Sequence, residues 1–140
     1  MNTFLLQLHS ILRWVIILFL LMNIFGLFAG KRNMGWSKLL LISAHLTLVI
    51  GIYQYYLKLQ ELLSLYGSFG AIMKNNVARF WAVEHISGMI LAIILITIGH
   101  VSLKKSGNTR KTAILYTIAL LVILAVVPWP FREGIGRHWF

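Results

Sequence analysis

The sequence predicts an all-α integral membrane protein, a four-helix up-down bundle in which residues 1–140 form a single domain. Two observations support this fold class. Of the 140 residues, 59% are hydrophobic and only 11% are charged, whereas a soluble domain carries about 25% charged residues. The apolar residues gather into four runs, each close to the roughly 20 residues that cross a bilayer as a helix. Because backbone groups find no water in lipid, such runs form helices.

Polar connections separate the four runs. We predict helices at about residues 4–29, 37–59, 79–103 and 111–129. Tight polar turns are expected at Gly30–Gly35 and at Lys104–Asn108, where glycines and polar residues interrupt the apolar pattern. The longest connection covers residues 58–76, and its leucines favour a short interfacial helix.

The net charge of +10 arises from 13 Lys and Arg residues against 3 acidic residues. In a soluble chain this excess would indicate nucleic-acid binding. Here the basic residues lie between apolar runs, so membrane topology explains them better. The short loops over residues 30–38 and 104–111 are basic and contain no acidic residue. Since short basic loops stay in the cytoplasm, we expect both termini on the opposite, periplasmic side of a bacterial inner membrane.

Ionisable side chains inside the spans are the candidate functional residues, because they are costly in lipid. His9 and Arg13 share a face of the first helix. His85, in the third helix, lies within about one helical turn of the depth of His9. Two imidazoles at one depth on diagonal helices of a bundle suit a haem b iron. The chain has no cysteine, which excludes covalent haem attachment and disulfides.

The residues around His85 leave space for a flat porphyrin ring. Gly88 belongs to a stripe of small residues along the third helix, which a partner helix or a flat macrocycle can approach. Arg13 could bind a haem propionate or pair with Glu84. The simpler alternatives are that His9 lies at the membrane interface and that His85 is a hydrogen-bonded packing residue. Arg79 and Arg132 are further propionate candidates.

Two other histidines leave several interpretations open. His45 lies near the middle of the second helix. It could bind a second cofactor, donate to a backbone carbonyl in a neighbouring helix, or line a quinone pocket with Tyr56. His100 lies close to the cytoplasmic surface, where an interfacial role is expected.

Several strings of the chain resemble one known family. They are LHS at residues 8–10, RFWAVEHI at residues 79–86 and PWPFRE at residues 128–133. Together with the segment around His45, they are similar to small bacterial four-helix membrane proteins often labelled "cytochrome b". The resemblance covers nearly the whole chain. It implies haem or redox association through His9, His45 and His85.

The leading hypothesis is therefore a small inner-membrane b-type cytochrome in electron transfer, an electron carrier or subunit rather than a stand-alone enzyme. The alternative is a cofactor-free accessory subunit or assembly factor of a larger respiratory or envelope complex, or a homo-oligomer. The face formed by Ser43, Thr47 and Gly51 could meet such a partner. Hydrolase and kinase motifs are absent from the sequence. Lipid and a quinone are the expected small partners; nucleic acid is not.

Overall fold

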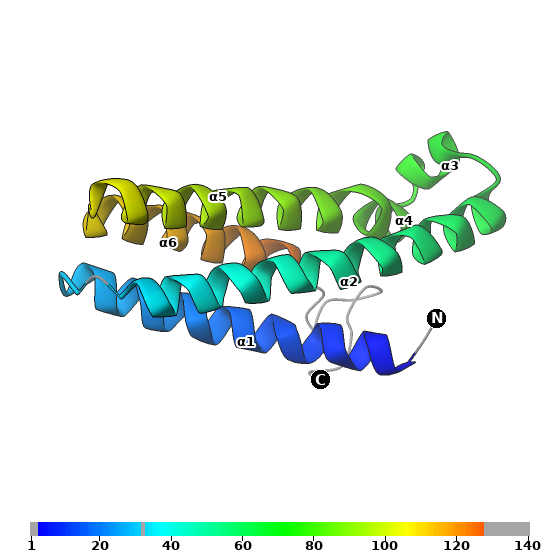
Figure 1. Cartoon of the computed structure of the whole chain (residues 1–140). Coiled ribbons are helices and arrows are strands. Elements are labelled where there is room, and N and C mark those ends of the chain that lie inside the picture. Colours follow the sequence, from blue (N-terminus) through cyan, green and yellow to red (C-terminus); the bar gives the residue numbers. More distant parts are fainter. Residues whose placement is uncertain (1–2, 32, 128–140) are drawn as a thin grey trace.

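The computed structural model describes residues 3–31 and 33–127, and within them it is all-α (Figure 1). The elements in chain order are α1 (Thr3–Phe28), α2 (Met34–Tyr66), α3 (Phe69–Lys74), α4 (Asn76–Arg79), the π-helical turn η1 (Phe80–Glu84), α5 (His85–Ser106) and α6 (Thr109–Val126). The four long helices run up and down, which confirms the predicted four-helix bundle. The last two residues of the predicted fourth helix, 128 and 129, lie outside the described residues.

The surface of the bundle identifies its solvent. Four helical segments are long and apolar enough to cross a membrane: Gln7–Phe28, Met34–Tyr66, Asn76–Ser106 and Thr109–Val126. Large apolar side chains cover their outward faces; Phe25 is 72% exposed, Val49 66% and Leu121 61%. A continuous apolar surface of this kind is unfavourable in water. The chain is therefore a multi-pass membrane protein whose outer surface faces lipid.

Both short turns lie at one end of the bundle, which we call the turn end. Gly30 follows α1 in the left-handed backbone conformation, with a φ of +81°. Gly107 follows α5 in the same conformation, with a φ of +67°. An asparagine then caps each following helix. Asn33 accepts a hydrogen bond from the Trp36 amide, and Asn108 accepts one from the Lys111 amide, both at 3.0 Å. Asparagine is among the strongest N-cap residues, so each turn both stops one helix and starts the next.

At the opposite end, which we call the N-terminal end, α2 is longer than the sequence predicted. It continues to Tyr66 instead of ending near residue 59, and Gly67 stops it with a φ of +82°. The leucines expected to form an interfacial helix therefore belong to α2 itself. The short helix of the connection is α3, at Phe69–Lys74. Leu62 and Ile72 pack together with Ala78 and Ala82 in a small second core, which holds this connection against the bundle.

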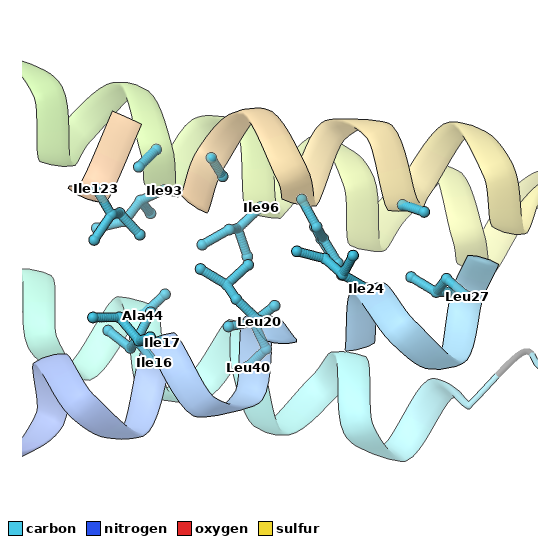
Figure 2. Packing of buried hydrophobic residues seen from close by; sticks show 14 of the residues in the cluster. Ile16, Ile17, Leu20, Ile24, Leu27, Leu40, Ala44, Ile93, Ile96 and Ile123 are labelled. Atoms are coloured by element: carbon cyan, nitrogen blue, oxygen red, sulfur yellow. The ribbon is translucent and has the colours of Figure 1, made fainter. Parts of the chain in front are cut away.

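The helices form a square in which α1 and α5 lie diagonally. The neighbouring pairs are α1 with α2 and α6, and α5 with α2 and α6. The predicted diagonal placement of the first and third spans is confirmed. Leu20, Leu40 and Ile96 meet in the centre with no exposed surface or almost none (Figure 2). The core thus fills the middle and turn end of the square.

The small-residue stripe of α5 packs against α6. A methyl group added at Gly88 would overlap Val126 Cγ1 and lie 2.9 Å from Val126 Cγ2. One added at Gly99 would lie 2.7 Å from Tyr116 Cε1. Small residues let two membrane helices approach closely. The sequence allowed either a partner helix or a flat macrocycle beside this stripe. In the structure a partner helix, α6, lies there.

A buried polar cluster joins three helices near the turn end. Ser37 Oγ bonds both the Tyr116 hydroxyl and, at 2.8 Å, His100 Nδ1. Thr112 donates to the Gly99 carbonyl at 3.1 Å. His100 lies near the turn end, as expected, and its ring is in addition linked to α2. Side-chain hydrogen bonds of this kind connect helices in lipid.

Candidate functional site

The N-terminal half of the bundle contains a cavity of about 90 Å³ between α1, α2, η1, α5 and α6. His9 and Arg13 line it from α1, and Trp81 and His85 line it from η1 and the start of α5. The remaining wall is mostly apolar and includes Ile93. A cavity with few polar groups in an apolar wall is the usual form of a ligand site in a bundle.

The two histidines of the cavity face each other from diagonal helices. Their ring centroids lie 6.5 Å apart with an interplanar angle of 68°. Gly51 of α2 makes room for His9, since a methyl group there would lie 3.3 Å from His9 Cε1. The sequence placed His9 and His85 at one depth, and the structure brings them together.

His85 is held in a defined orientation. Its Nδ1 lies 2.8 Å from the carbonyl oxygen of Val126, the last residue of α6. Because a carbonyl oxygen can only accept, Nδ1 carries the proton, and in the neutral ring Nε2 is the acceptor nitrogen. The rings of Phe80 and Trp81 pack beside it, with centroids at 5.8 and 5.6 Å. This arrangement is typical of a metal-ligating histidine, whose second nitrogen donates to a carbonyl.

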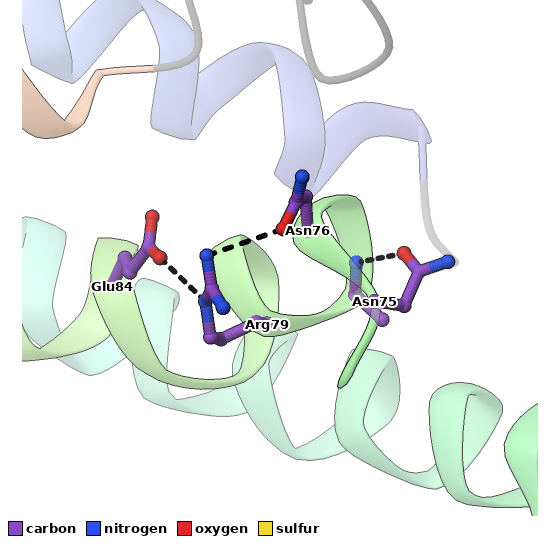
Figure 3. Close-up of polar contacts among 5 residues, drawn as sticks. Asn75, Asn76, Arg79 and Glu84 are labelled. Carbon is purple, nitrogen blue, oxygen red and sulfur yellow. Dashed lines mark hydrogen bonds and ion pairs between the residues drawn. The ribbon is translucent and has the colours of Figure 1, made fainter. Parts of the chain in front are cut away.

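The π-helical turn η1 directly precedes His85. It spans Phe80–Glu84 and inserts an i→i+5 pattern where the sequence predicted a regular helix. Such π-helical turns are rare and frequently occur at functional sites. Such a wider turn rotates the side chains that precede it about the helix axis, relative to the side chains that follow it. Glu84 is on the outside, where it accepts a 2.9 Å hydrogen bond from Arg79 Nε (Figure 3).

The charged residues settle one of the alternatives for Arg13. Glu84 is not its partner, because Glu84 binds Arg79 instead. Arg13 is 9% exposed, and its guanidinium lies 5.2 Å from the ring centroid of Trp14. Arg79 also donates to Asn76 at 3.3 Å on the outer surface, so it lies away from the cavity (Figure 3).

Two predicted site residues lie elsewhere. His45 is exposed on the outer face of α2, and its Nδ1 bonds the Leu41 carbonyl of its own helix at 2.9 Å. The bond to a carbonyl of a neighbouring helix, which was one of the roles left open for His45, does not form, because the ring bonds its own helix α2. Gly88 faces Val126 of α6 and is not part of the cavity wall. Arg132 lies outside the described residues.

The sequence analysis missed the contribution of α2. Thr47, Gly51, Gln54 and Lys58 follow one another at spacings of four, three and four residues, and all four line the cavity. Thr47 and Gly51 had been assigned to a face that could meet a partner protein, but they face the interior of their own bundle. Continuing the same three- or four-residue spacing for two more steps along α2 would have identified Gln54 and Lys58.

The fold and the cavity define a class: a small four-helix membrane protein with a half-buried pair of histidines. Among the described residues, no group of three or more His, Asp or Glu side chains could hold a metal ion by itself. No family model matches the chain, and neither a curated protein nor a solved structure is significantly similar to it. The resemblance to the four-helix "cytochrome b" proteins stays a prediction.

Proposed function

We propose that the chain is a small b-type-cytochrome-like protein in which His9 and His85 bind a haem b iron for electron transfer. The carrying observation is the 6.5 Å separation of the two ring centroids. Two imidazoles on opposite sides of one metal ion, each with a metal–nitrogen bond of about 2 Å, have centroids about 6 Å apart. The spacing therefore suits two axial ligands of one iron.

The donor chemistry of the cavity fits a haem. With its proton on Nδ1, which donates to Val126, His85 would bind iron through Nε2 as a neutral ligand, and Arg13 provides positive charge for a propionate. The space is smaller than a porphyrin needs: about 90 Å³, against roughly 300–1,000 Å³ for common cofactor pockets. Haem binding thus requires the helices to separate at the N-terminal end.

The residues of the chain have distinct roles in this proposal. Val126 fixes the tautomer and orientation of His85. Phe80 and Trp81 cover the ring and exclude water from it. A bound haem would supply reversible one-electron redox chemistry, and an apolar, water-poor wall is one of the features by which a protein sets its potential.

The test is a reduced-minus-oxidised visible spectrum of the full chain, purified in detergent from haem-replete cells. We expect the sharp α-band of a low-spin b-type haem at about one haem per chain. A colourless protein, with no band after added hemin, would contradict the proposal.

The second candidate is a cofactor-free accessory subunit or assembly factor of a larger membrane complex, or a homo-oligomer. The small cavity volume and the filling of the Gly88 stripe by Val126 favour it. The same spectrum separates the two functions. If no haem is bound, cross-linking in native membranes is expected to capture a partner or a second copy. A quinone is expected as an electron partner only if the chain is the haem-binding electron carrier.

We also propose that the turn end faces the cytoplasm of a bacterial inner membrane and that the N-terminal end is periplasmic. The basic turns support this orientation. Because the chain has no cysteine, single cysteines report on one position only. A membrane-impermeant maleimide should label Ser64→Cys in whole cells with a permeable outer membrane, and Lys105→Cys only after lysis. The reverse pattern would invert the topology.

A further inference from the structure

We propose that the cavity recognises a carboxylate-bearing amphiphile, and that Gln54 and Lys58 of α2 bind its acid group together with Arg13. This inference deepens the proposed haem site, since haem carries propionates, but it does not require iron. It rests on the unpaired amide donor of Gln54 and on the sign of the charge along the cavity wall.

The side chains that carry this inference are hydrogen-bond donors and cations. Gln54 is only 8% exposed, and its Nε2 has no hydrogen-bond partner among the described residues. A buried amide donor without an acceptor is costly, so a ligand that supplies an oxygen atom would satisfy it. Lys58 and Arg13 are the charged residues of the described wall, and both are cations.

Three other polar groups of the wall donate to backbone carbonyls of the protein. Thr47 donates to the Ser43 carbonyl and Tyr55 to the Ala82 carbonyl, each at 2.7 Å. The Nδ1 proton of His85 is bound by Val126. No carboxylate lines the described cavity. A complementary ligand therefore presents acceptor oxygens and negative charge.

The geometry places this acid group beside the histidines. Gln54 and Lys58 are four residues apart on one face of α2, and Gly51 of the same face contacts His9. Lys58 Nζ lies 5.8 Å from the ring centroid of Trp81. Its ion pair with Glu61 is long, at 3.8 Å, and Glu61 is 55% exposed. Exposed pairs of this kind are weak, so a buried carboxylate can replace Glu61 as the partner of Lys58.

The opposite part of the wall is apolar. Ile16 and Ile93 line the cavity toward the bundle centre, where they can contact a hydrocarbon body. Two sources have this chemistry: the propionates of a porphyrin and the head group of a fatty acid. Both combine an apolar body with a carboxylate, and the experiment below distinguishes them.

The test uses iron-free ligands, so that it does not depend on axial ligation by histidine. Metal-free protoporphyrin IX and its dimethyl ester are titrated against the purified full chain, and binding is followed by porphyrin fluorescence. Oleate and its methyl ester are compared in a second arm by isothermal titration. We expect the free acid to bind about tenfold more tightly than its ester in at least one arm, which is the size of one charged hydrogen bond.

The variants locate the preference. Lys58→Gln and Gln54→Leu should each reduce the acid-over-ester ratio, whereas Lys58→Arg should keep it. Lys74→Gln, which removes an exposed cation of α3 outside the cavity, is the matched control and should leave the ratio unchanged. Equal affinity for acid and ester in both arms, or an unchanged ratio in Lys58→Gln and Gln54→Leu, would overturn the inference. A preference found only for oleate would support it with a fatty acid as the source of the carboxylate, and the visible spectrum would still decide the haem function separately.

Discussion

His9→Ala and His85→Ala are each expected to abolish the low-spin haem spectrum, because each removes one of two axial ligands. A single remaining imidazole gives a five-coordinate, high-spin iron or no stable binding. His45→Ala is the matched control, since it removes a histidine of the same bundle that is exposed on the outer face of α2. It should keep the wild-type spectrum. Visible spectra at equal protein concentration provide the measurement.

The outcome that contradicts this ligand pair is specific. If His45→Ala removed all haem while His9→Ala kept it, His45 and His85 would be the ligands. Helix α2 would then have to rotate, because His45 lies on the face opposite to the cavity-lining Thr47 and Gly51.

Gly88→Ala should lower the thermal stability of the bundle and reduce haem content at the same time. The added methyl group overlaps Val126 Cγ1, and overpacking a filled interface costs about 1–3 kcal/mol. Val126 also holds His85 through its carbonyl, so a displaced end of α6 would release the ring. The double variant Gly88→Ala with Val126→Ala should recover most of the stability, because the smaller side chain makes room.

Melting in detergent, followed by circular dichroism, measures this effect. Gly26→Ala is the control, since its added methyl group would lie 3.6 Å from the Trp36 ring in ordinary contact, and alanine favours a helix over glycine. It should be neutral or stabilising. Wild-type stability of Gly88→Ala would mean that α6 does not pack closely on Gly88.

Most of the fold could be predicted from the sequence because lipid leaves few alternatives to helices. The length of α2 could not be predicted from hydropathy. Its last turns leave the apolar region and are held instead by Leu62 against the short core of the connection. Apolar leucines outside a span suggest a separate helix just as well as a continued one, and only the position of Gly67 distinguishes the two.

The depth of the site residues in the membrane could be predicted from the sequence. The direction in which each side chain points could be predicted only for some of them. His9 and His85 meet because both lie the same distance from one end of diagonal helices. The π-helical turn η1 interrupts the regular helical period just before His85, which no periodicity argument anticipates. Glu84, one of the partners considered for Arg13, binds Arg79. The environment of His45 also depends on the rotation of α2 about its axis, which the apolar pattern on all sides of a membrane helix does not determine.

The most direct test of the central claim is the low-temperature electron paramagnetic resonance spectrum of the oxidised full-length protein. Two imidazoles on one ferric haem give a low-spin signal. We predict that signal in the wild type, and its replacement by a high-spin signal or its loss in His85→Ala. A wild-type protein that contains haem but shows only a high-spin signal, or one that retains the low-spin signal in His85→Ala, would contradict the account.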